Sequence, residues 1–286
     1  RGLIVSYLSH DSATLDALLS RSAFGVINFW GGEPARTIVA QKVAENKHRP
    51  RLYVNGPLTG VALIDAEAAD DDAADGLAMN MVLYDQQLCS SPTLALFVGE
   101  HAQSLEFAKK VAAFLDEEGK DMPLELTESS LFTLQNGRRM LQMRGSTVMA
   151  GRSPRNTWTL AVSNGRSNMD EVAAQYRALS IHGRRRFLEI ITVPGLDKAV
   201  EIINALPSNQ AFAGIDKVQT IGLAAPIDKE NDYLDALSRT GVYRTVPVGD
   251  MFMRSAVEPY DGQALASLFT YITYRRGRNL RLEDVL

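Results

Sequence analysis

The sequence predicts an α/β fold built on a parallel sheet, because strand and helix patterns alternate along the chain. Short runs rich in β-branched and aromatic residues alternate with stretches in which apolar residues recur at helical spacing. The composition is that of an ordinary globular protein, with 45% hydrophobic and 22% charged residues. A length of 286 residues suits two modest domains or one large one.

The first part of the chain is predicted to alternate strands and helices. Strands are expected at residues 3–8, 24–30 and 51–54, and helices over 12–19 and from Glu33-Pro34 onward. Proline in a first turn and glutamate near the amino end both favour a helix start. The short crossing from Tyr53 to Pro57 is the best candidate for a domain boundary.

An acidic, alanine-rich segment at residues 65–75 leads into apolar residues that recur at helical spacing as far as Cys89. We expect a helix that ends at Cys89 and whose amino end is favoured by the acidic residues. A metal site is the alternative for the acidic run. Consecutive aspartates on a helix point in different directions, so the helix start is favoured.

The rest of the chain continues the alternation, without repeats or low-complexity tracts. Further strands are predicted at 93–98, 157–162, 187–193, 218–224 and 242–246, and further helices at 104–115, 128–142, 169–179, 197–206 and 230–238.

Charge and apolar patterning narrow the class of protein. A net charge of −4 leaves no basic excess to neutralise phosphates, which argues against a nucleic-acid binder. No apolar stretch is long enough for a membrane span, and no signal peptide is visible. A single cysteine excludes an internal disulfide and favours a reducing compartment, so we expect a cytoplasmic protein. Because the chain begins at Arg1 rather than Met and enters a predicted strand almost at once, we expect residues to precede it.

The single cysteine, Cys89, is the first candidate for chemistry. It lies at the predicted helix end, just before Ser90-Ser91-Pro92. A thiolate nucleophile needs a sulfur at the edge of an element, near polar groups that stabilise negative charge. The alternative is a small buried apolar side chain. The four histidines show no metal-ligand spacing and receive no role.

Two further segments are candidates for binding phosphate. Trp30-Gly31-Gly32-Glu33 joins a predicted strand to a predicted helix, where side-chain-free amides and the helix dipole favour an anion. A plain tight turn is the alternative. The run Arg184-Arg185-Arg186 can face a cofactor phosphate, but solvated residues before a strand are favoured. The same holds for the arginines of 275–278.

Several stretches together carry a resemblance to a known family. They are Phe29-Trp30-Gly31-Gly32, Tyr53-Val54-Asn55-Gly56-Pro57 followed by Ala62-Leu63-Ile64-Asp65, Asp85-Gln86-Gln87-Leu88-Cys89-Ser90-Ser91-Pro92, and Gly241-Val242-Tyr243-Arg244 with Tyr260-Asp261-Gly262. In order and spacing they resemble the acyl-CoA reductase branch (LuxC-type fatty acyl reductases) of the aldehyde dehydrogenase superfamily. The stretch around Cys89 is the most specific.

The resemblance implies an aldehyde dehydrogenase-like fold, with a parallel sheet in three αβα layers and without the N-terminal part of the cofactor domain. Residues 1–54 would form the C-terminal part of a Rossmann-like cofactor domain. Residues 55–240 would form the thiol-bearing catalytic domain, and 241–286 a return segment that serves oligomerisation. The superfamily's catalytic thiol corresponds to Cys89, and its cofactor-binding corner corresponds to Trp30, Gly31 and Gly32.

Two departures from the superfamily pattern bear on the chemistry. Where dehydrogenases carry a Glu-Leu-Gly-Gly-Lys motif, whose glutamate activates water, this chain has Tyr53-Val54-Asn55-Gly56-Pro57, without an acid. A reductase whose thioester is cleaved by hydride does not need that base. The glutamate of the Glu-Ile-Phe-Gly-Pro motif would fall near residues 182–186, where no carboxylate stands.

The resemblance therefore implies NADPH-dependent reduction of an acyl-CoA or acyl-thioester to an aldehyde through acyl-Cys89. It also implies a homo-oligomer and an acyl-transferring partner protein. Two alternatives remain open. One is an aldehyde dehydrogenase that oxidises an aldehyde to an acid, and the other is a non-catalytic relative that serves as an assembly subunit.

Overall fold

The chain divides into two compact units, which are described separately. The computed structural model describes residues 5–176, 179, 185–255, 257–264, 267 and 270. The larger unit comprises Gly56–Ala256, and the smaller comprises Arg1–Asn55 with Val257–Leu286. The first crossing between them falls within the predicted interval from Tyr53 to Pro57.

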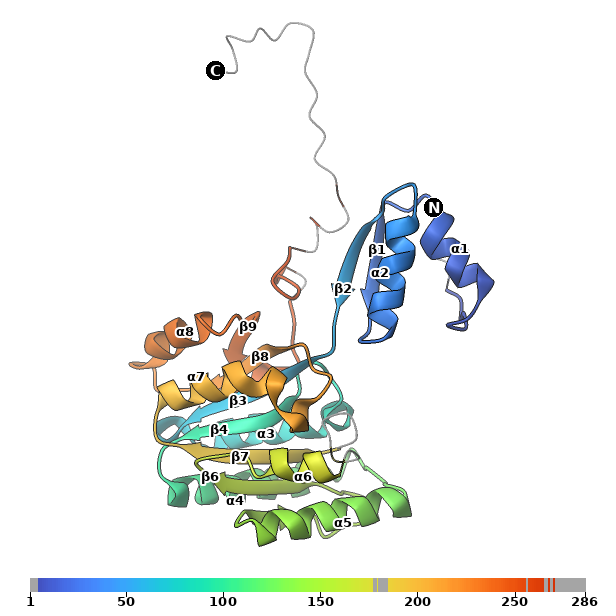
Figure 1. Cartoon of the computed structure of the whole chain (residues 1–286). Coiled ribbons are helices and arrows are strands. Elements are labelled where there is room, and N and C mark those ends of the chain that lie inside the picture. The colour runs from blue at the N-terminus through green and yellow to red at the C-terminus, as the bar shows by residue number, and fades with distance from the viewer. Residues whose placement is uncertain are drawn as a thin grey trace, which may run out of the picture. The chain divides into compact units, whose positions relative to one another are not determined.

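The larger unit is built on a seven-stranded sheet in the order β5-β6-β7-β4-β3-β8-β9 (Figure 1). Neighbouring strands are parallel except for the antiparallel pair β5–β6. The strands are β3 (Leu58–Asp65), β4 (Pro92–Val98), β5 (Thr147–Ala150), β6 (Thr159–Asn164), β7 (Phe187–Val193), β8 (Lys217–Ala224) and β9 (Arg244–Pro247).

Helices cover both faces of this sheet and make three layers (Figure 1). The side chains of α3 (Asp71–Val82) and α4 (His101–Glu118) share one buried apolar cluster with the sheet. The second cluster, against the other face, contains residues of four helices, α5 (Glu128–Met143), α6 (Met169–Gln175), α7 (Leu196–Ala205) and α8 (Glu230–Ser238). Short 3-10 turns complete the unit at η1 (Ala66–Ala68), η2 (Leu83–Gln86), η4 (Leu206–Ser208), η5 (Gln210–Phe212) and η6 (Val248–Asp250).

The smaller unit has a two-stranded parallel sheet, β1 (Val26–Trp30) and β2 (Arg51–Asn55), connected through α2 (Ala35–Glu45). Helix α1 (Ala13–Arg21) precedes it and is capped by Ser12, whose hydroxyl accepts a bond from the Thr14 amide. The buried amide of Asn46 donates to the Leu19 and Ser22 carbonyls and so joins α1 to the end of α2.

Most predicted elements are confirmed, and β7 and α8 have the predicted bounds. The predicted strand at 3–8 is wrong where the structure describes it, because residues 5–8 form no regular element; residues 3 and 4 lie outside the described part. Strands β3 and β5 were not predicted. Helix α6 ends at Gln175 instead of 179.

The C-terminal division also differs from the predicted one. Residues 241–255 lie in the larger unit, since β9 pairs with β8 in a register that begins with Thr220 opposite Arg244.

The acidic run does begin a helix, as one of the two interpretations predicted. The Asp70 carboxylate accepts a bond from the Ala73 amide, and Asp71 and Asp72 lie in the first turn of α3. The arginines of 275–278 lie outside the described residues.

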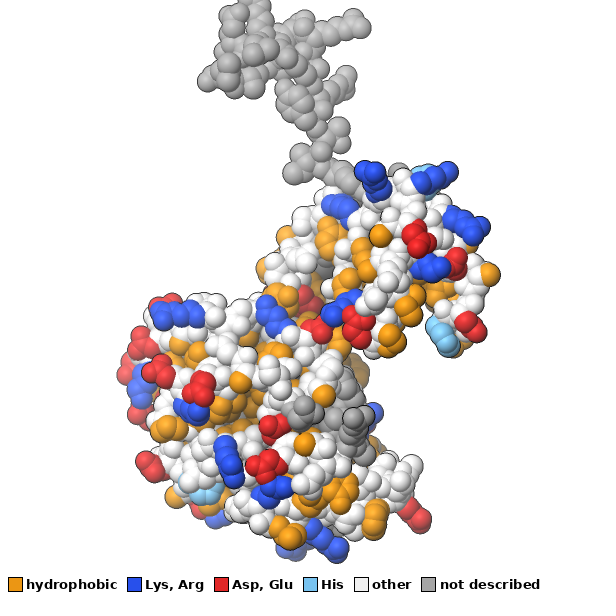
Figure 2. All heavy atoms as spheres, in the orientation of Figure 1, with side chains coloured by type: hydrophobic (Ala, Val, Ile, Leu, Met, Phe, Trp, Pro, Cys, Tyr) orange, Lys and Arg blue, Asp and Glu red, His pale blue; other side chains and the backbone are white. Residues whose placement is uncertain are grey.

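Surface charge is mixed. On the face shown in Figure 2, basic and acidic side chains are interspersed, in keeping with the small net charge of −4. Within the described part of the chain, none of the helices combines the length and the apolar character needed to cross a bilayer.

Candidate active site at the Cys89 turn

Cys89 lies in a turn that leads into β4, three residues before Pro92. The thiol is free, and the residue is half-buried. The prediction that a helix ends at Cys89 is wrong, because α3 ends at Val82 and the short η2 follows. The cysteine is therefore presented by an irregular segment at the amino edge of the sheet.

Three consecutive residues in η2 break the helix. Tyr84, Asp85 and Gln86 have φ angles of 51°, 52° and 64°, in the left-handed region. Each such conformation costs a non-glycine residue about 1–2 kcal/mol, so tertiary contacts must offset the strain.

The side chain of Gln86 supplies one set of these contacts. Its oxygen accepts a bond of 2.7 Å from the Phe187 amide. Its nitrogen donates to the Phe187 carbonyl at 3.0 Å and to the Pro92 carbonyl at 2.7 Å. The side-chain amide of Gln86 thus bonds the first residues of β4 and β7, which precede the first paired residues of the two strands, Leu94 and Glu189.

Arg186 supplies the other set. Its side chain is 1% exposed and donates to the Asp85 carboxylate at 2.7 Å. It also donates to the Met122 carbonyl and to the side-chain oxygen of Asn156. The favoured interpretation of Arg186 as a solvated residue is therefore wrong, because the Asp85 carboxylate and these oxygens replace water around the buried guanidinium. Arg184 lies outside the described residues.

On the downstream side, the turn lies directly on the backbone of β3. The Ser91 amide donates to the Leu88 carbonyl at 3.0 Å, and the Gly60 amide donates to the Ser91 carbonyl at 3.1 Å. A methyl group on Gly60 would lie 2.2 Å from the Ser90 carbonyl oxygen. Glycine is required here because the turn approaches so closely. The buried Ser91 hydroxyl has no hydrogen-bond partner among the described residues.

The other predicted site residues lie in the smaller unit, at the end of β1. The Gly31 amide donates to the Asn55 carbonyl at 3.0 Å, and Trp30 is 57% exposed with its ring edge against Tyr260. At the start of α2, the Glu33 carboxylate accepts bonds from the Thr37 amide and hydroxyl. The structure brings Trp30, Gly31 and Gly32 together at one corner; Cys89 belongs to the other unit.

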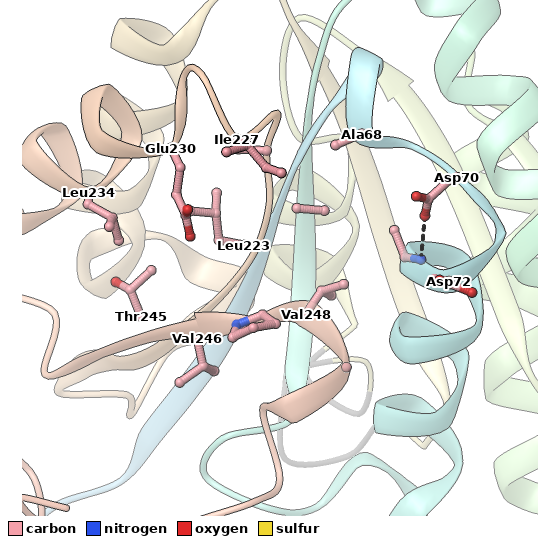
Figure 3. Close-up of a pocket in the computed structure, with 15 residues that line it drawn as sticks. Ala68, Asp70, Asp72, Leu223, Ile227, Glu230, Leu234, Thr245, Val246 and Val248 are labelled. Carbon is pink, nitrogen blue, oxygen red and sulfur yellow. Dashed lines mark hydrogen bonds between the residues drawn. The ribbon is translucent and has the colours of Figure 1, made fainter.

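A pocket of about 540 Å³ is drawn in Figure 3. It lies at the carboxyl edge of the large sheet, whereas Cys89 precedes β4 at the amino edge. It is formed by the segments that follow β3 and β8 and by β9, and it includes Ala68, Asp70, Ile227, Glu230 and Val246. Parallel sheets commonly bind ligands at this carboxyl edge. However, its described lining contains no cysteine, histidine, serine or lysine, and Asp70 already caps α3.

Comparison with known proteins identifies the family. A model of the family described as acyl-CoA reductase (LuxC) matches residues 1–271. The chain belongs to this family. The resemblance to this family, which several stretches of the sequence carry, is thereby confirmed. Among the described residues, no group of three His, Cys, Asp or Glu side chains forms a metal site.

This LuxC-family chain is 24% identical over 289 residues to the long-chain acyl-protein thioester reductase of Vibrio harveyi. That match covers 100% of the chain but 54% of the relative, so the chain spans about half of the relative's length.

Two solved structures show the fold. One is a salicylaldehyde dehydrogenase from Pseudomonas putida G7, with a TM-score of 0.59 and 17% identity over 95% of this chain and 58% of that one. The other is an NAD-dependent benzaldehyde dehydrogenase from Corynebacterium glutamicum, with a TM-score of 0.56 and 15% identity over 93% and 54%. The LuxC-family chain has an aldehyde dehydrogenase-like fold, as predicted.

Sequence reasoning did not assign roles to Gly60, Asp85, Gln86 and Arg186. Asp85 and Gln86 lie in the stretch from Asp85 to Pro92 that carries the family resemblance, but nothing in one sequence shows that they bond residues 101 positions away. An isolated glycine in an apolar run, such as Gly60, is a signal for close backbone approach.

Proposed function

We propose that the chain reduces an acyl thioester to an aldehyde, with Cys89 as the nucleophile and NADPH as the hydride donor. The observation that carries the proposal is the match to the acyl-CoA reductase family, together with the place of Cys89. The lone cysteine is half-buried on a turn held from both sides, as a nucleophile that must keep one orientation requires.

In the first step, the Cys89 thiolate attacks the carbonyl carbon of the thioester. The bond from that carbon to the sulfur of coenzyme A or of an acyl-carrying protein breaks, and the sulfur leaves with the electron pair as a thiolate, which takes a proton from water. The acyl group is then joined to Cys89 as a new thioester. The amide of Ser91 is occupied by the Leu88 carbonyl, so the Ser91 hydroxyl is the better candidate for an oxyanion donor in this turn.

The nicotinamide cofactor, when bound, supplies a hydride to the acyl carbon, and the aldehyde leaves as the Cys89 thiolate is regenerated. The residues proposed to hold it are Trp30, Gly31 and Gly32. Two successive glycines precede α2, and although the Phe29 ring lies against Gly31, the backbone of Gly32 carries no side chain, which fits a diphosphate. The Gly31 amide is used by Asn55, so we assign the phosphate contact to the backbone of Gly32.

The absence of an acid at the position of Tyr53 favours reduction over oxidation. Hydrolysis of acyl-Cys89 requires a base that activates water, and the motif from Tyr53 to Pro57 contains none. Thioester cleavage by hydride has no such requirement.

The proposal is tested by incubating the chain with labelled palmitoyl-CoA in the absence of cofactor. We expect one acyl group per chain, located on Cys89 by peptide mass spectrometry and removed by hydroxylamine. Cys89→Ala should carry no label. Label of equal yield on Cys89→Ala would overturn the assignment.

Two further readouts distinguish the alternatives. Addition of NADPH to the acylated chain should release the aldehyde, whereas release of the acid would favour the oxidative alternative. Nucleotide binding is followed by NADPH fluorescence. Absence of both binding and acylation would favour an assembly subunit without catalysis.

A further inference from the structure

The contact between Arg186 and Asp85 joins the start of β7 to the segment that presents the thiol. Arg186 is 1% exposed, and Asp85 is the one carboxylate it pairs with among the described residues. Both the Nε and the Nη2 atoms of Arg186 donate to the same Asp85 oxygen, at 3.1 and 2.7 Å. Two donors on one oxygen hold that carboxylate oxygen beside the buried guanidinium.

The contact stabilises a backbone segment whose left-handed conformation is unfavourable for residues other than glycine. Asp85 is the middle residue of the left-handed stretch Tyr84–Gln86. Gln86, the next residue, is held to Phe187 by two bonds, of 2.7 and 3.0 Å. Cys89 follows three residues later, and downstream the Ser91 carbonyl is bound by the Gly60 amide. The thiol thus lies between two anchors, and the upstream anchor depends on Arg186.

We propose that Arg186 is a positioning residue for Cys89, which acts by binding Asp85 and fixing the direction from which the thiol approaches a thioester. This inference rests on the proposed function. Arg186 itself touches neither substrate nor cofactor in this account. Arg186 therefore serves the nucleophile, instead of a cofactor phosphate.

A matched pair of variants separates positioning from simple support of the fold. Arg186→Met removes the contact, and Asp85→Asn weakens it while keeping the side-chain shape. The control is Arg138→Met. Arg138 is half-buried and donates to the Trp158 carbonyl and the Thr159 hydroxyl. Within the described residues, none of its hydrogen bonds reaches the segment 84–92.

Two rates are measured in the full chain, at a temperature well below the thermal unfolding midpoint of each variant. One is acylation of Cys89 by palmitoyl-CoA. The other is alkylation by iodoacetamide, which reports on this thiol alone because the chain has 1 cysteine. We expect acylation to fall by about tenfold to a hundredfold in Arg186→Met and by less in Asp85→Asn. Alkylation, which needs no fixed approach, should stay within about twofold in both.

The double variant Asp85→Asn/Arg186→Met should acylate at the rate of Arg186→Met alone, since both changes break one contact. Three results would overturn the inference: unchanged acylation in Arg186→Met, an equal loss in Arg138→Met, or additive losses in the double variant. If the unaltered chain is not acylated at Cys89, the proposed function fails, and the inference that rests on it fails for that separate reason.

Discussion

The two units of this chain differ sharply in how many of their strand residues are buried. In the larger unit, the inner strand β3 is buried at every position after Leu58. In the smaller unit, neither β1 nor β2 has a buried residue. Parallel strands are usually covered on both faces, and a two-stranded sheet is marginal in isolation. The thiol is therefore carried by a unit with a closed core, and the diglycine corner by one with very little core.

This contrast predicts that core substitutions will have unequal costs. Leu96, on β4, is 0% exposed, and Val43, on α2, is 6% exposed with few buried neighbours. Leu96→Ala should lower the free energy of unfolding of its unit by about 2–5 kcal/mol. Val43→Ala should cost about 1 kcal/mol, for the smaller volume removed.

Each unit has its own fluorescent reporter for this measurement. The chain has 2 tryptophans, Trp30 in the smaller unit and the buried Trp158 in the larger. Leu96→Ala is measured by urea unfolding in a Trp30→Phe background and Val43→Ala in a Trp158→Phe background. We also expect the Trp30 transition at lower urea. Coincident transitions with equal costs would show that the units unfold as one.

Within the larger unit, Gly60 lies against the turn that carries Cys89. Gly60→Ala places a methyl group against the Ser90 carbonyl, so the turn must shift, at a cost of about 1–3 kcal/mol. Acylation of Cys89 should fall with it. The control is Gly195→Ala, where a methyl group would meet nothing within 4 Å and the φ angle of −175° suits any residue. Equal acylation in the two variants would contradict the account.

The smallest effect concerns a buried carboxylate in the larger unit. Burial raises the pKa of Glu189 above its usual 4.5, although bonds from Ser167, Ser163 and the Asn168 amide oppose the shift. The folded state then holds the proton more tightly than the unfolded chain. Stability should decline as the pH rises from about 4.5 through the folded pKa.

Glu189→Gln cannot ionise and should lack this decline. Urea unfolding at about pH 5 and about pH 8 should therefore show the variant gaining stability relative to the unaltered chain as the pH rises. A difference between the two proteins that does not change with pH would show that Glu189 does not titrate in this range.

The same comparison explains what the sequence could and could not reveal. Strand β7 and helix α8 follow strong local patterns, and their bounds were predicted. Strand β3 contains glycine and alanine, which are weak strand formers, and it is stabilised by pairing with β4 and β8 on either side. Its burial is a property of the whole sheet.

The Cys89 turn shows the same limit. No glycine, proline or asparagine marks the break at Tyr84–Gln86, so the apolar spacing predicted an uninterrupted helix. The break depends on Arg186 and Phe187, which are remote in sequence. Cys89 was found as a candidate from its local context, whereas the residues that hold its turn became visible only in the fold.

The thiol-bearing turn belongs to the larger unit, whose core is closed. Hydrogen–deuterium exchange of the full chain, read by peptide mass spectrometry, tests this most directly. We expect peptides covering 84–92 to be protected nearly as well as β4 and β7, and those covering β1 and β2 to exchange ~100-fold faster. Exchange in 84–92 as fast as in β1 would contradict the account, because the turn would then lack the anchors described here.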